Sequence, residues 1–198
     1  MPAPKLFGFG NGDDAQRYFL QALNISEKLA RAEPQRADYL RDLSVSYNKL
    51  GELMNALGNG DDAQRYFLMD LEIAEKLARA EPQRADYQRD LSVSYNKLGD
   101  LMNALGNGDD AQRYFQQALN IRTTLARAEP QRADYQRDLV ISLMRMADMD
   151  TQRAENYLEQ ALSILPALKR SGRQVAHRDE MMAWLEGRLA DVRAGRGA

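Results

Sequence analysis

The sequence predicts an all-α solenoid of antiparallel helix pairs, with about eight helices in its 198 residues. The segment Asn-Gly-Asp-Asp-Ala-Gln-Arg-Tyr-Phe begins at Asn11, Asn59 and Asn107, so the chain repeats every 48 residues. A fixed period in this range is typical of stacked supersecondary units. Within each copy apolar residues recur at steps of three and four, which is the spacing of one helix face, and no segment alternates as a strand would.

The first helix of a copy is predicted over residues 61–81 and is called helix B. Its apolar stripe consists of Ala63, Tyr66, Phe67, Leu71, Ala74, Leu77 and Ala78. Gly58-Asn59-Gly60 supplies a turn, and Asp61, with Gln64 three residues later, fits an N-terminal cap. A calcium loop needs further carboxylates at alternating positions, which are missing here. The chain begins with a helix B near 13–33.

The second helix of a copy, called helix A, follows Pro82, which ends helix B or begins helix A. Its stripe consists of Tyr87, Leu91, Ser94, Tyr95, Leu98, Leu101, Met102 and Leu105. Two helices of about 20 residues joined by short turns must lie antiparallel. The expected organisation is an arm over 1–10, an array over 11–194 and a tail over 195–198, with repeats at 11–58, 59–106 and 107–154 and a degenerate unit with a capping helix over 155–194.

The predicted capping helix, near 174–193, aligns with helix A and keeps an apolar stripe of Met182, Leu185, Leu189 and Val192. The last unit of a solenoid needs such a cap because no neighbour covers it. We therefore interpret Trp184 and the Met181-Met182 pair as cap packing rather than as a ligand box, and His177 as a surface residue.

Two copies resemble the tetratricopeptide repeat. Tyr47-x2-Leu50-Gly51-x2-Met54 followed by Ala63-x3-Phe67 fits its pattern, and the same residues return 48 positions later, from Tyr95 to Phe115. A third unit reads Leu143-x2-Met146-Ala147 and then Ala154-x3-Leu158, after a turn about five residues shorter. The resemblance implies a right-handed superhelical solenoid in a long variant of the family, with helix A lining the concave surface.

Asp70 departs from this pattern, because Ala22 and Ala118 stand at the same place in the other copies. The family usually has a small residue there, where two helices approach closely. Either the carboxylate is paired or the helix contact is loose.

Composition excludes several functions. The 27 Lys and Arg balance 29 Asp and Glu, which leaves no basic field for nucleic acid. The chain has no cysteine and one histidine, so we expect no enzyme activity, no metal and no cofactor. No apolar run is long enough for a membrane span or a secretory signal, and we expect a cytoplasmic protein.

The predicted function is a protein-protein interaction scaffold that binds a peptide or protein on helix A. Polar residues lie off the core stripe of this helix and repeat between copies: Arg41, Asn48, Glu52, Asn55, Arg89, Asn96, Asp100 and Asn103. Their asparagine amides can donate to and accept from an extended peptide backbone. The alternative is a solvated helix face that the duplication preserved.

A second hypothesis is a self-associating structural solenoid. The first helix B has no helix A before it, and extra apolar residues gather at this end: Leu6, Phe7, Phe9 and Leu40. Such a patch either receives the chain's own arm or pairs with a second copy in a homodimer.

Overall fold

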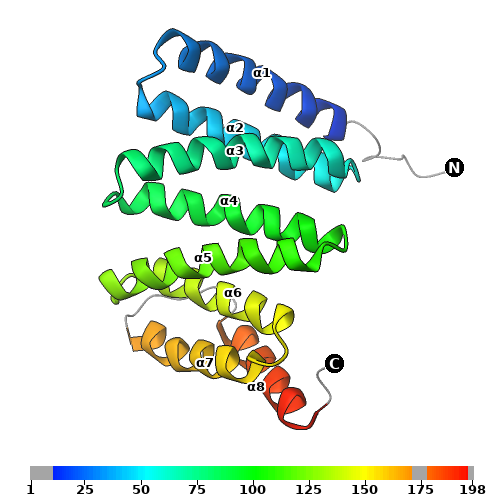
Figure 1. Ribbon diagram of the computed structural model, residues 1–198, viewed down its shortest axis with the longest axis vertical. Helices are drawn as coiled ribbons and strands as arrows, with labels where there is room; N and C mark the ends of the chain where they lie inside the picture. Colours follow the sequence, from blue (N-terminus) through cyan, green and yellow to red (C-terminus); the bar gives the residue numbers. More distant parts are fainter. Residues whose placement is uncertain (1–10, 171–177, 196–198) are drawn as a thin grey trace, which may run out of the picture. The chain divides into compact units, whose positions relative to one another are not determined.

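The computed structural model describes residues 11–170 and 178–195, and within them every regular element is an α-helix. In chain order the helices are α1 (Asn11–Ala32), α2 (Ala37–Ala56), α3 (Gly60–Ala80), α4 (Ala85–Ala104), α5 (Gly108–Ala128), α6 (Ala133–Met149), α7 (Ala154–Arg170) and α8 (Arg178–Arg193) (Figure 1). The all-α prediction and the expected number of helices are confirmed over these residues.

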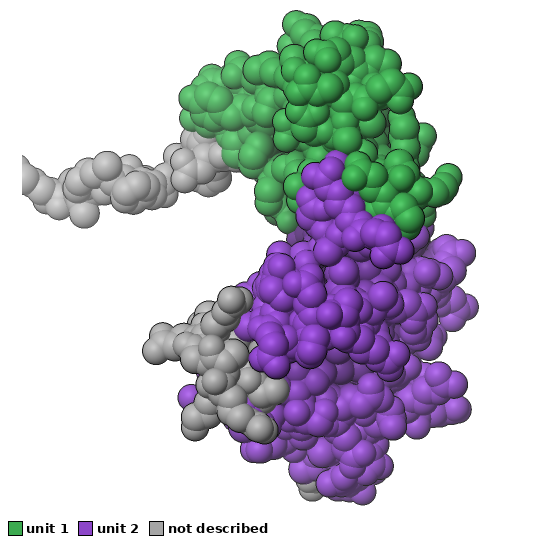
Figure 2. Space-filling view, turned by 90° about the vertical axis from the view of Figure 1, so that its left-hand side faces the viewer, with its two compact units in different colours: residues 1–82 green, residues 83–198 purple. Residues whose placement is uncertain are grey.

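The chain divides into two compact units, residues 1–82 and 83–198 (Figure 2). Unit 1 contains α1, α2 and α3, and unit 2 contains α4 to α8. Within each unit every helix packs against the helix before it. The helices α1 to α3 and α4 to α7 alternate in direction, as Figure 1 shows. Helices α2, α4 and α6 are the helices A of the sequence, and α1, α3, α5 and α7 are the helices B.

The turn from helix A to helix B is a glycine cap. Gly58 adopts φ of 76° and Gly106 adopts φ of 79°, the left-handed region that favours glycine. Around the first of these turns the Asn59 amide donates to the Met54 carbonyl over 2.9 Å. Asn59 is also the N-cap of α3, because its side chain accepts from the Asp62 amide. The predicted cap, Asp61, is therefore wrong by two residues and lies in the first turn of α3.

A glycine of helix A lies against a phenylalanine ring of helix B in two of the helix pairs. A β-carbon added to Gly51 would lie 2.6 Å from the Phe67 ring, and one added to Gly99 would lie 2.5 Å from the Phe115 ring. These distances are shorter than any real carbon contact, so only glycine lets each phenylalanine occupy its place. Phe67 and Phe115 are consequently almost fully buried.

The degenerate third pair is shortened in its helices rather than in its turn. Helices α6 and α7 have 17 residues each. By comparison α4 has 20 residues and α5 has 21. The connection over 150–153 is no shorter than the one over 105–107, so the prediction of a shorter turn is wrong. The missing residues come from the end of α6 and the start of α7.

Helix α8 packs on α7, as a cap should. Leu185 and Leu189 are buried, and Arg193 donates to Glu155 over 2.7 Å. Trp184, however, is 41% exposed, so its predicted role in cap packing is wrong. His177 and the predicted start of this helix lie outside the described residues.

Candidate interaction surface

Helices α4 and α6 of unit 2 are joined by an ion pair on the face predicted to bind a partner. Arg89 of α4 donates from Nε to Asp138 Oδ2 of α6 over 2.7 Å, and its Nη1 lies 3.6 Å from Asp134 Oδ2. The hydrogen bond to Asp138 raises the pKa of Arg89 above its ordinary value. Arg89 is therefore committed to α6.

A second ion pair joins the same helices further along. Arg145 of α6 donates to both carboxylate oxygens of Asp100 on α4, over 2.9 and 2.8 Å. Its guanidinium also lies 5.6 Å from the centroid of the Phe115 ring. This two-point geometry fixes both side chains better than a single contact would, although Asp100 stays exposed.

Arg122 of α5 is buried and donates hydrogen bonds to both α4 and α6. It donates from Nε to Ser92 Oγ over 3.1 Å, and from Nη1 to the Asp138 carbonyl and to Ser142 Oγ over 2.9 and 3.1 Å. The residue is only 7% exposed, and burial lowers the pKa of Arg122 to about 10, which leaves it protonated at neutral pH. Arg122 thus supports the α4–α6 face from the interior.

Sequence reasoning missed Arg122, although a signal existed. Ala74 stands at this position in the preceding copy and Ser26 in the first, so a long cation replaces a small residue within nearly identical repeats. Such a departure from a repeat marks a position at which the side chain of one copy makes contacts that the other copies lack.

The predicted asparagines of unit 2 fall into two kinds. Asn103 is exposed at the end of α4, as a binding residue should be. Asn96 is only 4% exposed and donates from Nδ2 to the Ser92 carbonyl over 2.9 Å. Its Oδ1 is buried and has no hydrogen-bond partner in the part of the chain that the structure describes. Asn96 is therefore not part of an accessible surface.

In unit 1, Asn48 contacts the unusual Asp70. Its Nδ2 donates to Asp70 Oδ2 over 2.9 Å, and Ser44 Oγ donates to the other carboxylate oxygen. Asp70 is 3% exposed, so the paired alternative is correct and the contact between α2 and α3 is not loose there. The side-chain amide of Asn48 is therefore engaged by Asp70 within the helix pair.

The remaining candidates on α2 are accessible to different degrees. Glu52 accepts from Lys49 over 2.8 Å, Asn55 is exposed, and Arg41 is half-buried. Leu40 is half-buried against the core of unit 1, so it does not belong to an open patch. The other residues predicted for self-association, Leu6, Phe7 and Phe9, lie outside the described residues.

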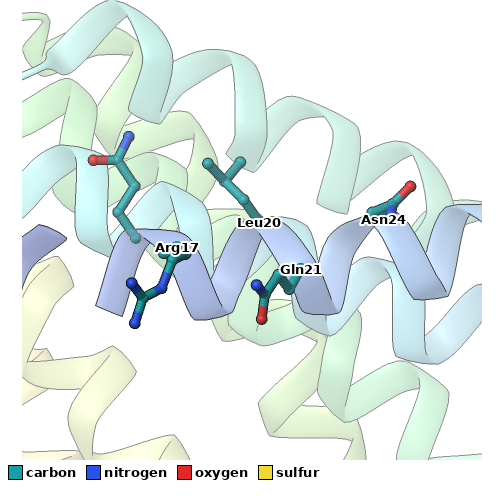
Figure 3. Close-up of a pocket in the computed structure, with 5 residues that line it drawn as sticks. Arg17, Leu20, Gln21 and Asn24 are labelled. Carbon is teal, nitrogen blue, oxygen red and sulfur yellow. The ribbon is translucent and has the colours of Figure 1, made fainter. Parts of the chain in front are cut away.

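A shallow hollow lies on α1 and is lined by Gln16, Arg17, Leu20, Gln21 and Asn24. Figure 3 shows Leu20 and Asn24 on one side of the helix and Arg17 and Gln21 on the other, so these side chains do not converge on a ligand. Over residues 11–170 and 178–195 no group of three acidic, histidine or cysteine side chains is placed to hold a metal ion. In the same ranges no helix combines the length and the apolarity needed to cross a bilayer.

Each unit thus contains an antiparallel helix pair with a glycine–phenylalanine contact and a polar helix A face. The sequence profile of the tetratricopeptide repeat matches residues 90–167. The resemblance drawn from the sequence is thereby confirmed over residues 90–167, which have the tetratricopeptide repeat pattern.

Two solved structures are similar to this chain over most of its length. BtubC from P. vanneervenii is 15% identical, with a TM-score of 0.45 and coverage of 94% of this chain and 92% of that one. A thermophilic tetratricopeptide repeat protein from Thermus thermophilus is 18% identical, with a TM-score of 0.46 and coverage of 93% of this chain and 96% of that one. Comparison with curated protein sequences gives no match.

Proposed function

We propose that the chain is a protein-interaction scaffold that binds an extended peptide or protein segment on its helix A face. In unit 2 this face is formed by α4 and α6, and in unit 1 by α2. The tetratricopeptide match supports a scaffold of this general kind. The observation on which the proposal rests is the Asp100–Arg145 pair, whose side chains are 44% and 30% exposed while each fixes the other.

The chemistry of this face suits a neutral peptide backbone. Asp100 and Arg145 cancel in charge, and the amide of Asn103, one turn after Asp100, has both donors and an acceptor. Side chains that are already fixed lose less conformational entropy when a ligand binds. A ligand carboxylate would meet Asp100, so an anionic terminus is disfavoured.

Selection of peptides tests the proposal. A random-peptide display library is panned on the full chain, and the affinity of a selected peptide is measured by calorimetry. We expect the double variant Asp100→Ala, Asn103→Ala to weaken binding about tenfold or more, because it removes one fixed acceptor and one amide. The control is Gln117→Ala, an exposed change on helix B α5.

Both variants change exposed side chains and should keep the circular dichroism spectrum of the parent chain. Equal binding by the parent and the double variant would show that the ligand lies elsewhere. Weaker binding by Gln117→Ala alone would place it on the opposite face.

A self-associating solenoid is the second candidate, and the apolar face of α1 favours it. Sedimentation over a concentration series separates the two: a homodimer that selects no peptide would support self-association.

We also propose, together with the scaffold function, a cytoplasmic location, no nucleic-acid partner and no catalytic role. Cell fractionation and a gel shift at low salt test the first two, and a screen for turnover of common substrate classes tests the third.

A further inference from the structure

Helix α1 exposes an apolar stripe along one face. Tyr18 is 61% exposed, Ile25 59% and Leu29 38%, and Ala22 lies between them and is exposed as well. The four residues follow each other at steps of four, three and four, so they share one side of the helix. Exposed apolar residues in such a row mark an interaction surface more often than scattered ones do.

The same face is covered in two other helices B, α3 and α5. Leu77 in α3 and Leu125 in α5, at the position of Leu29, are 6% and 8% exposed. Their stripes pack against α2 and α4, the helices A that precede them. In unit 1 and in unit 2, the helix that covers this face of a helix B is therefore a helix A.

The covering helix has a recognisable pattern. Its tyrosine lies beside the tyrosine of helix B, with ring centroids 6.2 Å apart for Tyr47 and Tyr66 and 6.3 Å for Tyr95 and Tyr114. Its glycine makes room for a phenylalanine of helix B. In α1, Tyr18 and the half-buried Phe19 stand at the corresponding positions.

Charges beside the stripe match the same kind of helix. In unit 2, Arg89 and Asp100 of α4 pair with Asp138 and Arg145 of α6. On α2 the positions of the last two are taken by Asp42 and Lys49, which are both exposed. No side-chain partner of Asp42 is present among the described residues.

We infer that the open stripe of α1, with Asp42 and Lys49 of α2, is a docking site for an amphipathic helix of a partner polypeptide that has the helix A pattern. The pattern is a tyrosine, a Leu-Gly pair one turn later, and an arginine and an acid spaced as Arg89 and Asp100 are. This site goes beyond the proposed function, because it lies on a different surface and takes a helix rather than an extended segment.

A fluorescent synthetic peptide with the sequence of residues 85–104 serves as the probe. It is titrated with the full chain, and its anisotropy is measured. We expect saturable binding, and the variant Ile25→Glu should weaken it about tenfold or more because a carboxylate then enters the apolar contact. Leu20→Glu is the matched control, since Leu20 is 42% exposed on the other side of the same helix and should leave binding unchanged.

Changes in the peptide test the register. Replacing the glycine of the peptide by valine (G99V) should weaken binding about tenfold, because the branched side chain meets Phe19. Reversing the arginine of the peptide (R89E) should also weaken binding, and the charge-reversed chain Asp42→Arg should restore it. A failure of this restoration would contradict the predicted register.

Several outcomes would overturn the inference. No saturation at roughly 1 mM chain, or equal binding by the parent chain and Ile25→Glu, would exclude the site. A dimer that Ile25→Glu abolishes would assign the stripe to a second copy, and binding only after removal of residues 1–10 would assign it to that segment. The Asp100→Ala, Asn103→Ala variant should bind this peptide normally, so a failure here is separate from a failure of the proposed function.

Discussion

The α2–α3 pair of unit 1 and the α4–α5 pair of unit 2 have nearly the same sequence and different polar interiors. In the first pair Asp70 accepts hydrogen bonds from Ser44 and Asn48. In the second pair Ala118 stands in its place, and Asn96 is left with an unpartnered Oδ1 among the described residues. The glycine-phenylalanine contact and the tyrosine pair are the same in both.

This difference shows that the contacts that pack two helices together are not the same as the polar contacts that tie specific helices to each other. Apolar spacing and the glycine contact set the antiparallel packing in both pairs. Two polar exchanges, Asp70 for Ala118 and Ala74 for Arg122, decide which helices are tied together. Asp70 ties α3 to α2, and Arg122 ties α5 to both α4 and α6. Buried polar groups of this kind select an arrangement even where they add little stability.

The largest expected effect comes from the contact that the two pairs share. Gly51→Val and Gly99→Val should each lower the free energy of unfolding by about 3 kcal/mol, because the new side chain overlaps a buried phenylalanine ring. Gly187→Ala on α8, which has open space around it, should instead gain about 0.5–1 kcal/mol from helix propensity. Urea unfolding measures all three. A neutral result at Gly99 with a loss at Gly51 would show that the pairs do not share this contact.

An exchange at the position where the pairs differ should give a smaller effect of opposite sign in each. Asp70→Ala should cost about 1–3 kcal/mol, because Ser44 and Asn48 lose their buried acceptor. Ala118→Asp should gain about 1 kcal/mol, since the carboxylate can accept from the second Nδ2 hydrogen of Asn96 and from Arg122, one turn further along α5. The Ser92 hydroxyl does not contribute, because it already donates to the Arg89 carbonyl. Thermal unfolding of both variants checks the signs. Destabilisation by Ala118→Asp would mean that the two interiors are not interchangeable.

The smallest effect concerns Tyr47, whose hydroxyl donates to Glu27 over 3.1 Å. Burial, together with this bond, raises the pKa of Tyr47 to about 12 from an ordinary value of 10. The folded state therefore favours the neutral phenol. Its contribution to stability is complete below pH 10 and is lost as the pH rises from 10 through about 12.

At neutral pH, Tyr47→Phe should cost about 1 kcal/mol, the value of one hydrogen bond. The difference between the parent and Tyr47→Phe should then shrink above pH 10 in urea unfolding. Tyr18→Phe is the control, because Tyr18 is 61% exposed. A difference that stays constant up to pH 12 would contradict the assigned environment.

The repeat and its periodicity were sufficient to predict eight helices, their antiparallel order and the family. They also placed Arg89, Asp100 and Asn103 on helix A, away from the core. Periodicity could not reveal that Asn96 is buried, because that depends on Ser92 and on the approach of Arg122 from another helix. It likewise left the pairing of Asp70 open, since its two donors lie on α2, far away in the sequence.

Exposure at the ends of the helices was equally hard to predict. Trp184 lies beside Leu185 in the sequence, but one is exposed and the other fully buried, because a step of about 100° along a helix separates them. Only the position of α7 decides which side of α8 is covered.

The sharpest test of partner binding on the helix A face is to follow the amide NMR shifts of the full chain during titration with a display-selected peptide. We predict the largest shift changes around Asp100, Asn103 and Arg145, with Gln117 on helix B unaffected. Changes concentrated around Gln117 and absent from Asp100 and Asn103 would contradict the claim.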